Sequence, residues 1–140
     1  MTHFRLPDGL LGCEVDLGSV RVTGEMIAAY ARAVGDDTTL AGPLEEAPPT
    51  FCLALGLGMK PDVPLPPGLF GVYGGHDLEF HRPIRAGETY HIRARIVDVY
   101  EKSGRTGALT VVVREAEVMD AAGRLAARIT ERQIVRQGPG

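Results

Sequence analysis

The chain has 140 residues, of which 44% are hydrophobic and 24% charged, and its formal net charge is −3. This length fits a single domain over residues 1–140, and we expect frayed ends at about 1–8 and 137–140. The acidic balance argues against a nucleic-acid surface, and no stretch reaches the length of a membrane span. Since Met1 is followed by no signal-peptide pattern, we expect a soluble, cytoplasmic protein.

The cysteines and histidines give no metal pattern. Cys13 and Cys52 do not follow metal-ligand spacing, and neither does any pair of histidines, so we expect no metal site. Cys52 stands in an apolar run, which favours a buried, reduced thiol.

The first third of the chain predicts one amphipathic helix. Residues 1–22 are expected to form a loose lead-in with a short strand near its end. Thr23 is suited to the N-cap of a helix over 24–34, and Gly35 is suited to its C-terminus. The polar residues 36–39 then predict a turn.

A second helix is predicted over residues 51–59. Thr50 is a good N-cap for it, and its side chains are apolar on every side, which is typical of a buried helix. Four prolines within residues 60–68 predict a rigid, irregular loop.

The remainder predicts an antiparallel sheet. Alternating strands are expected over 72–81, 89–99, 109–119 and 124–135, and turn-forming residues separate them at 85–88, 102–107 and 120–123. A buried helix followed by long strands predicts an α+β domain in which an antiparallel sheet wraps around a central helix.

His76 stands out within the first of these strands. Strict alternation from Val72 to Phe80 places Val72, Gly74, His76, Leu78 and Phe80 on one face and Asp77, Glu79 and His81 on the other. A histidine on an apolar face beside Gly74 and Gly75 is either a functional group or a core histidine bonded to a carbonyl.

Four segments in order resemble one known family. They are Tyr30-Ala-Arg-Ala-Val-Gly-Asp36, Ala47-Pro-Pro-Thr-Phe51, Glu79-Phe-His-Arg-Pro-Ile-Arg-Ala-Gly-Glu88 and Arg95-Ile-Val-Asp-Val-Tyr-Glu-Lys102. Over residues 18–136 the chain resembles the MaoC-like dehydratases, specifically the N-terminal group of FAS1-type dehydratases. The resemblance implies a hot-dog fold.

The resemblance also implies an activity. Members of this class bind acyl thioesters of coenzyme A or of acyl carrier protein, so coenzyme A or pantetheine belongs to the substrate and no separate cofactor is expected. Active members are lyases that hydrate an enoyl thioester or dehydrate a 3-hydroxyacyl thioester. Their Asp-His dyad is spaced Gly-Asp-x-Asn-Pro-x-His. Here residues 35–41 retain Asp36, but Ala41 stands at the histidine position, and the following segment is shortened.

These considerations give a set of candidate site residues. Asp36 and His76 are the candidates for acid–base chemistry, with a helix-end turn residue as the alternative for Asp36. The amides at Thr50 and Phe51 are expected to face the thioester oxygen, unless Thr50 only caps the helix. Gly74 and Gly75 are assigned to substrate binding beside His76, and Arg82 to the phosphates of coenzyme A, with solvation as its alternative.

Three functions stay open at this point. The chain is an acyl-thioester-binding protein that is itself a hydratase or dehydratase, or it is the non-catalytic binding subunit of a heteromeric hydratase. A hot-dog thioesterase using Glu45, Glu46 or Asp36 is the third. Because hot-dog subunits pair their sheets, we expect a homodimer or larger oligomer, or a heterodimer with a catalytic subunit.

Overall fold

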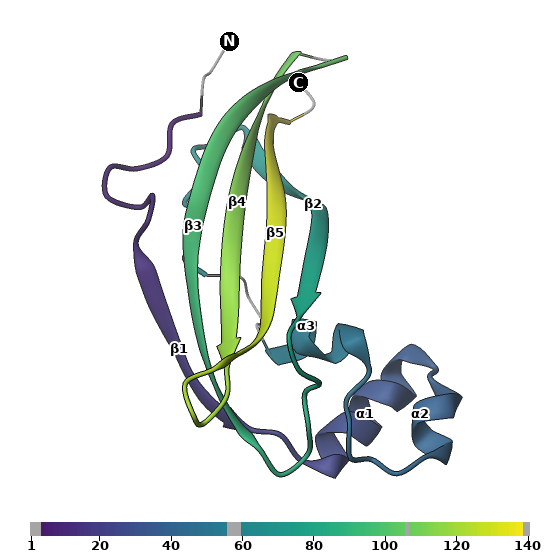
Figure 1. Cartoon of the computed structure of the whole chain (residues 1–140). Coiled ribbons are helices and arrows are strands. Elements are labelled where there is room, and N and C mark those ends of the chain that lie inside the picture. Colours follow the sequence, from purple (N-terminus) through teal and green to yellow (C-terminus); the bar gives the residue numbers. More distant parts are fainter. Residues whose placement is uncertain (1–3, 56–59, 106, 139–140) are drawn as a thin grey trace.

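The structure, a computed structural model, describes residues 4–55, 60–105 and 107–138 (Figure 1). Its elements in chain order are β1 (Glu14–Arg21), α1 (Gly24–Val34), α2 (Asp37–Ala41), the 3₁₀ turn η1 (Pro49–Phe51), α3 (Cys52–Leu55), β2 (Leu69–Phe80), β3 (Thr89–Gly104), β4 (Gly107–Met119) and β5 (Leu125–Gln137). The predicted α+β class is therefore confirmed.

The five strands form one antiparallel sheet in the order β1-β3-β4-β5-β2. The strand expected near the end of the lead-in over residues 1–22 is present but longer than predicted, because β1 spans eight residues and pairs with β3. A register shift between Asp16 and Gly18, where Gly18 has a φ of +83°, interrupts the alternation that would have identified this strand.

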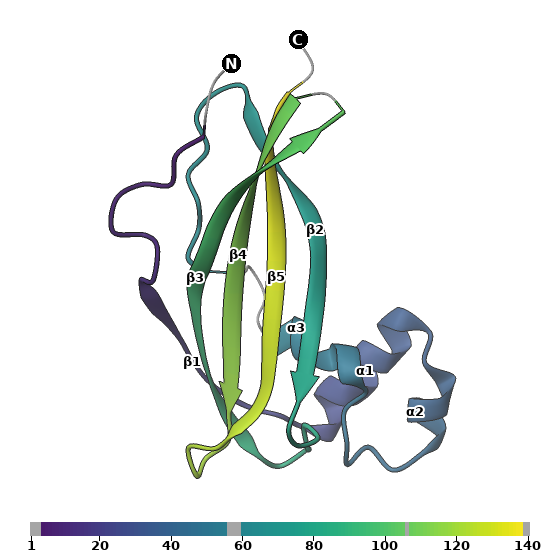
Figure 2. The same ribbon diagram turned by 45° about the horizontal axis from the view of Figure 1, so that its top comes forward.

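The β3–β4 hairpin is longer than its sequence predicts. Residues 102–107 were expected to be a turn, but both strands continue until Gly104 pairs with Gly107. The glycines, taken as turn residues, instead stand at the last pair of the ladder. Both views show this hairpin projecting beyond the rest of the sheet, at the end away from α1 and α2 (Figures 1 and 2).

The first helix forms as predicted. The Thr23 hydroxyl accepts a hydrogen bond from the Met26 amide over 3.2 Å, which satisfies one of the free donors of the first turn. Gly35 ends α1 in the left-handed conformation with a φ of 73°.

The second helix begins differently from the prediction. Thr50 is not its N-cap: it lies inside η1, and Pro48 stands at the N-cap position without a side-chain bond. Pro49 is suited to the first helical position, so the turn begins two residues earlier than expected. The helix is described up to Leu55, and the predicted continuation over residues 56–59 lies outside the described residues.

Two hydrophobic clusters cover one face of the sheet, which we call the covered face. The first joins α1, η1 and α3 to the sheet and contains Ile27, Phe51, Cys52, Tyr90, Ala116 and Ile129. The second contains Phe4, Ile96, Val112 and Val135, with Val63 and Leu65 of the proline-rich loop packed against it. The helices lie at one end of the sheet, and residues 4–10 run alongside its other end (Figures 1 and 2).

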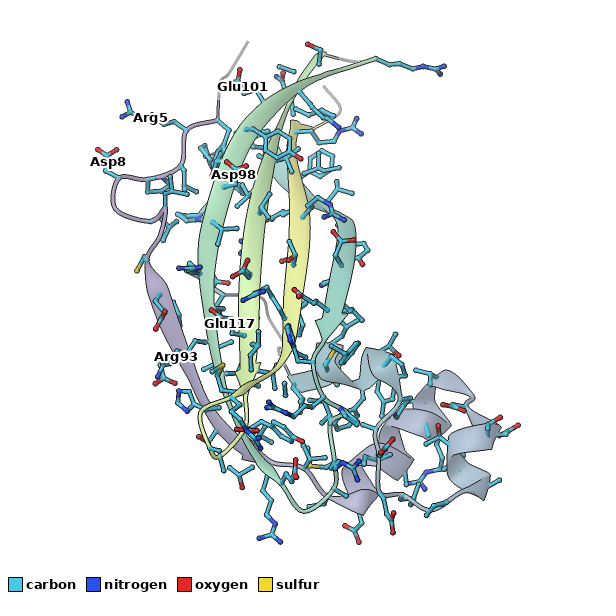
Figure 3. The ribbon with its side chains drawn as sticks, in the orientation of Figure 1. Arg5, Asp8, Arg93, Asp98, Glu101 and Glu117 are labelled. Atoms are coloured by element: carbon cyan, nitrogen blue, oxygen red, sulfur yellow. The ribbon has the colours of Figure 1, made fainter. Side chains whose placement is uncertain are left out.

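Charged side chains cover the opposite face of the sheet (Figure 3). Arg128 pairs with Glu79 over 3.1 Å, and Arg132 pairs with Asp77 over 2.6 Å. These cross-strand pairs confirm that Asp77 and Glu79 share this face, which we call the open face. The hydrogen bond from Arg132 lowers the pKa of the Asp77 carboxyl.

Among the residues that the structure describes, no helix has both the length and the apolar character needed to cross a membrane.

Candidate functional site

A bulge in β2 determines which side chains face the covered side of the sheet. The pairing with β5 shifts between Tyr73 and Gly75, so the alternation changes sign at Gly74. His76, Leu78 and Phe80 share the covered face, as predicted, but the prediction that Val72 and Gly74 join them was wrong. At Gly74, a Cβ atom would come within 2.9 Å of the Arg132 carbonyl, and Gly75 has a φ of +129°, so this bulge depends on glycine.

His76 lies in a polar environment on this covered face. Its Nδ1 atom lies 2.5 Å from the Tyr73 hydroxyl, and the two rings are 4.9 Å apart. Across the sheet it faces Glu131, its register partner on β5. Cross-strand partners on one face have Cβ atoms about 5 Å apart, so His76 is a direct neighbour of a carboxylate.

Arg114 and Glu131 form a buried charged pair that the sequence analysis missed. Their residues are only 4% and 8% exposed, and Arg114 Nη1 lies 3.5 Å from Glu131 Oε2. Arg114 also donates to the Pro61 carbonyl over 2.9 Å and to Gln133 over 2.8 Å. Burial lowers the pKa of the Arg114 guanidinium, while the charge of Glu131 opposes that shift. The sequence does contain a signal for Arg114, of the same kind as for His76. Arg114 is a polar residue on the face of a strand whose neighbouring residues, Val112 and Ala116, are apolar.

An open cleft of about 430 Å³ gives access to this pair from the β2 edge. Its lining includes Asp62, Tyr73, Arg114, Glu131 and Gln133. Buried donors and acceptors beside an open cleft are typical of a small-molecule site. Among the described side chains, no group of three His, Cys, Asp or Glu residues is arranged to hold a metal ion.

Asp36 does not line this cleft; it stands at the N-cap of α2. Its carboxylate accepts from the Thr39 amide over 3.0 Å and from the Thr39 hydroxyl over 2.5 Å, so it caps that short helix. These bonds lower the pKa of the Asp36 carboxyl. Ala41, at the family's histidine position, is the last residue of α2. The structure therefore does not bring Asp36 and His76 together, since α2 lies beside α1 and away from the middle of β2 (Figure 1).

Thr50 and Phe51 are engaged in local contacts. The Thr50 hydroxyl accepts from the Tyr30 hydroxyl over 2.5 Å. The Phe51 amide donates to the Pro48 carbonyl over 3.0 Å, and the Phe51 ring is buried in the first cluster. The Phe51 amide is thus already used by the 3₁₀ turn in this structure.

The charged candidates near the ends of the strands are paired. Arg82 donates to Asp120 over 3.1 Å, and that contact ties the end of β2 to the turn before β5. Glu46 pairs with Arg85 over 2.9 Å, and the two residues also form an isolated β-bridge. A thioesterase carboxylate at Glu46 would first have to leave this pair.

A separate polar cluster lies on the open face at the β1 edge. His91 Nδ1 lies 2.9 Å from the Ser19 hydroxyl, and His91 Nε2 lies 2.9 Å from an Asp16 oxygen. The same Asp16 oxygen accepts from the Gly18 amide over 2.8 Å, and this bond lowers the pKa of the Asp16 carboxyl. Nε2 has no hydrogen bond of good geometry to any described residue, so the three residues lack the alignment of a hydrolase triad. We assign the cluster to holding β1 on β3.

The family model described as "FAS1-like, dehydratase domain region" matches residues 10–129. The chain belongs to this family. The FAS1-like dehydratase region thus includes α2, most of the sheet, and η1 with α3, which we call the central helical segment. The predicted relationship to the MaoC-like dehydratases is confirmed. Among the curated proteins, none matches this chain.

Solved structures confirm the hot-dog fold of this FAS1-like dehydratase domain. A MaoC-like dehydratase is 22% identical with a TM-score of 0.70, and the match covers 91% of this chain but 42% of that one. The MaoC-like dehydratase of Rhodospirillum rubrum is 19% identical with a TM-score of 0.63, covering 98% and 100%. The HadBC (3R-hydroxyacyl-ACP dehydratase) complex of Mycobacterium tuberculosis is 20% identical with a TM-score of 0.66, covering 92% and 99%. The chain spans less than half of the first of these proteins.

Proposed function

We propose that this chain is an acyl-thioester-binding subunit of the hydratase and dehydratase class, and that it leaves the dyad chemistry to a partner hot-dog subunit. Hydration of an enoyl thioester needs a base for water, an acid for the α-carbon and donors for the thioester oxygen. In this class an Asp and a His act together.

The proposal rests on residues 35–41, which correspond to the segment that holds the Asp-His dyad in the family. Asp36 accepts two hydrogen bonds from Thr39 as the cap of α2, and Ala41 offers no imidazole. A carboxylate held at low pKa by these bonds is a weak base and has no partner histidine at the family position. The segment supports binding better than it supports catalysis.

The substrate would lie against the covered face of the sheet. Phe51, Ile129 and their neighbours supply an apolar surface there, and the cleft beside Tyr73 opens at the sheet edge. Coenzyme A or pantetheine would arrive as part of the thioester, not as a resident cofactor. We also propose a cytoplasmic location, as the sequence led us to expect.

The free edge of β2 supports assembly into a dimer. β2 ends the sheet, and four large hydrophobic side chains on it are exposed, namely Phe70, Val72, Tyr73 and Phe80. A long edge strand with exposed apolar residues is a template for pairing with another chain. Two structural neighbours, HadBC and ChsH1-ChsH2 of Mycobacterium tuberculosis, are described as complexes. By analogy, we propose a dimer through β2, with a second copy or with a catalytic homologue.

His76 supports a second candidate, hydration by this chain itself. His76 is the register partner of Glu131, and its Nδ1 atom lies 2.5 Å from the Tyr73 hydroxyl, so the imidazole has a group with which it can exchange a proton. In that case His76 would take the role of the missing dyad histidine.

Crotonyl-coenzyme A distinguishes the two candidates. The purified chain is titrated with it by calorimetry, and the enoyl absorbance is followed in the same samples, beside His76→Ala and Asp36→Asn. Binding without loss of absorbance supports the subunit role. Turnover that His76→Ala abolishes supports the second candidate, and absence of binding rejects the proposal.

A further inference from the structure

Polar side chains form a belt across the covered face of the sheet. The register aligns Ile96, Arg114, Glu131 and His76 in one row from β3 to β2. The neighbouring row aligns Val112, Gln133 and Tyr73. We call Arg114, Glu131, Gln133, Tyr73 and His76 the polar belt.

The belt separates the two hydrophobic clusters. On β4, Arg114 lies between Val112 of the second cluster and Ala116 of the first. On β5, Glu131 follows Ile129 of the first cluster at a distance of two residues, about 7 Å along the strand. An acyl chain that extends from α3 along this face therefore leaves an apolar surface and meets buried charges.

One oxygen of the polar belt lacks a hydrogen-bond donor among the described residues. Arg114 Nη1 is 3.5 Å from Glu131 Oε2, which is longer than a good hydrogen bond, and no described residue donates a hydrogen bond to that oxygen. Glu131 is nonetheless only 8% exposed. A buried carboxylate oxygen without a donor is unfavourable. This oxygen is enclosed, but Glu131 lines the cleft, so a ligand hydroxyl in the cleft reaches it by a rotation of the Glu131 side chain and gains affinity.

The charges of the belt select a neutral ligand group. Arg114 and Glu131 offset each other, and Asp62, at the mouth of the cleft, pairs with Lys60 over 2.5 Å. No net charge is left for an ionic ligand. If Nδ1 of His76 accepts from Tyr73, Nε2 carries the proton and is a donor, so the belt offers both an acceptor and a donor.

We propose that the polar belt is a specificity site for acyl thioesters whose chain carries a second polar group, a hydroxyl on the fifth carbon or further from the thioester, beyond the carbons at which the family's reaction takes place. The hydroxyl donates to Glu131 Oε2. It accepts from Nε2 of His76 when Tyr73 donates to Nδ1, or from the Tyr73 hydroxyl when Nδ1 carries the proton. An alkyl chain of the same length cannot replace these bonds and would desolvate the charged pair without compensation. This inference rests on the proposed binding function and names its substrate class.

Calorimetric titration of the full chain tests the inference. The probes are octanoyl-coenzyme A and four isomers of hydroxyoctanoyl-coenzyme A with the hydroxyl on the fifth, sixth, seventh or eighth carbon. We expect at least one isomer to bind about tenfold or more tightly than octanoyl-coenzyme A, as a hydrogen bond to a buried charge would give. If every isomer binds equally to octanoyl-coenzyme A or more weakly, the inference is overturned. If no thioester binds, the proposed function itself fails.

A paired substitution locates the preference. Arg114→Met with Glu131→Leu replaces the buried ion pair by apolar side chains, an exchange that folded proteins often tolerate. We expect this variant to lose the preference and to bind octanoyl-coenzyme A more tightly. The matched control, Arg128→Met with Glu79→Leu, removes an ion pair from the open face and should keep the preference.

A conservative variant keeps the test decisive if the paired substitution does not fold. Glu131→Gln retains the shape and removes the charge, and we expect the preference for the hydroxylated chain to fall several-fold. An unchanged preference in Glu131→Gln or in the folded paired variant overturns the inference.

Discussion

The hydroxyl of Tyr30 donates a hydrogen bond to the hydroxyl of Thr50 over 2.5 Å, and this contact joins α1 to the turn that begins the central helical segment. The Tyr30 ring also meets the Phe51 ring edge-on, with 5.7 Å between the ring centres. One side chain of α1 thereby orients both residues that the sequence analysis assigned to the thioester oxygen.

Removing this hydroxyl should cost a small, measurable amount of stability. For Tyr30→Phe we expect the free energy of unfolding to fall by about 0.5–1 kcal/mol, since the bond is partly exposed and the ring contact remains. Thr50→Val should have a similar effect, and urea unfolding of the double variant should show less than the sum of the two. Strict additivity would contradict a direct bond between these hydroxyls.

The sequence predicted α1 well because its signals are local. Thr23 and Gly35 both act within one helix, and each forms as expected at its end of α1. The family and the hot-dog fold were also predictable, because they depend on several segments in order.

The polar belt was not predictable from one strand at a time. His76 was recognised from its alternation, but the bulge at Gly74 moved Val72 to the other face, and single-strand patterns do not reveal bulges. Arg114 and Glu131 become neighbours only through the β4–β5 register. Likewise, the role of Asp36 as a cap depends on α2, which is too short to be recognised from periodicity.

The two thiols should differ sharply in reactivity. Burial raises the pKa of the Cys52 thiol to about 11, and Cys52 donates to the Pro49 carbonyl over 3.3 Å, whereas Cys13 is exposed. At pH 8 we expect iodoacetamide to modify one thiol per native chain and two in denaturant, as counted by mass spectrometry. The Cys13→Ser variant should be unmodified in the native state. Rapid native labelling of that variant would show that Cys52 is accessible.

The β2 edge should control assembly. We expect the purified chain to sediment as a dimer and Val72→Lys to shift it towards a monomer, because a charge on an edge strand opposes pairing. Val97→Lys is the matched control, since Val97 is similarly exposed, at 36% against 39% for Val72, but lies on β3, away from that edge. Equal oligomeric states for the parent chain and Val72→Lys would contradict pairing through β2.

Tyr90 should hold the turn before β3. Its hydroxyl accepts from the Arg85 amide over 2.9 Å and donates to Glu88 over 2.6 Å, while its side chain is 1% exposed. We expect Tyr90→Phe to lower the free energy of unfolding at pH 8 by about 1–2 kcal/mol, because two partners lose a bond. Tyr100→Phe, at an exposed tyrosine, should change it little.

This stability difference should depend on pH. Burial raises the pKa of Tyr90 to about 12, whereas an unfolded tyrosine ionises near pH 10. The unfolded parent chain therefore releases this proton first, and the stability it contributes is present below pH 10 and lost as pH rises towards 12. In urea unfolding, the gap between the parent chain and Tyr90→Phe should shrink from pH 9 to pH 11. A constant or growing gap would contradict the buried hydroxyl.

The most direct test of the binding-subunit role is titration of the purified chain alone with crotonyl-coenzyme A, with the enoyl absorbance followed during the titration. We predict saturable binding and an enoyl absorbance that stays constant, because Asp36 caps α2 and Ala41 stands at the histidine position. A loss of absorbance at an enzymatic rate would contradict the account and identify the chain as a hydratase in its own right.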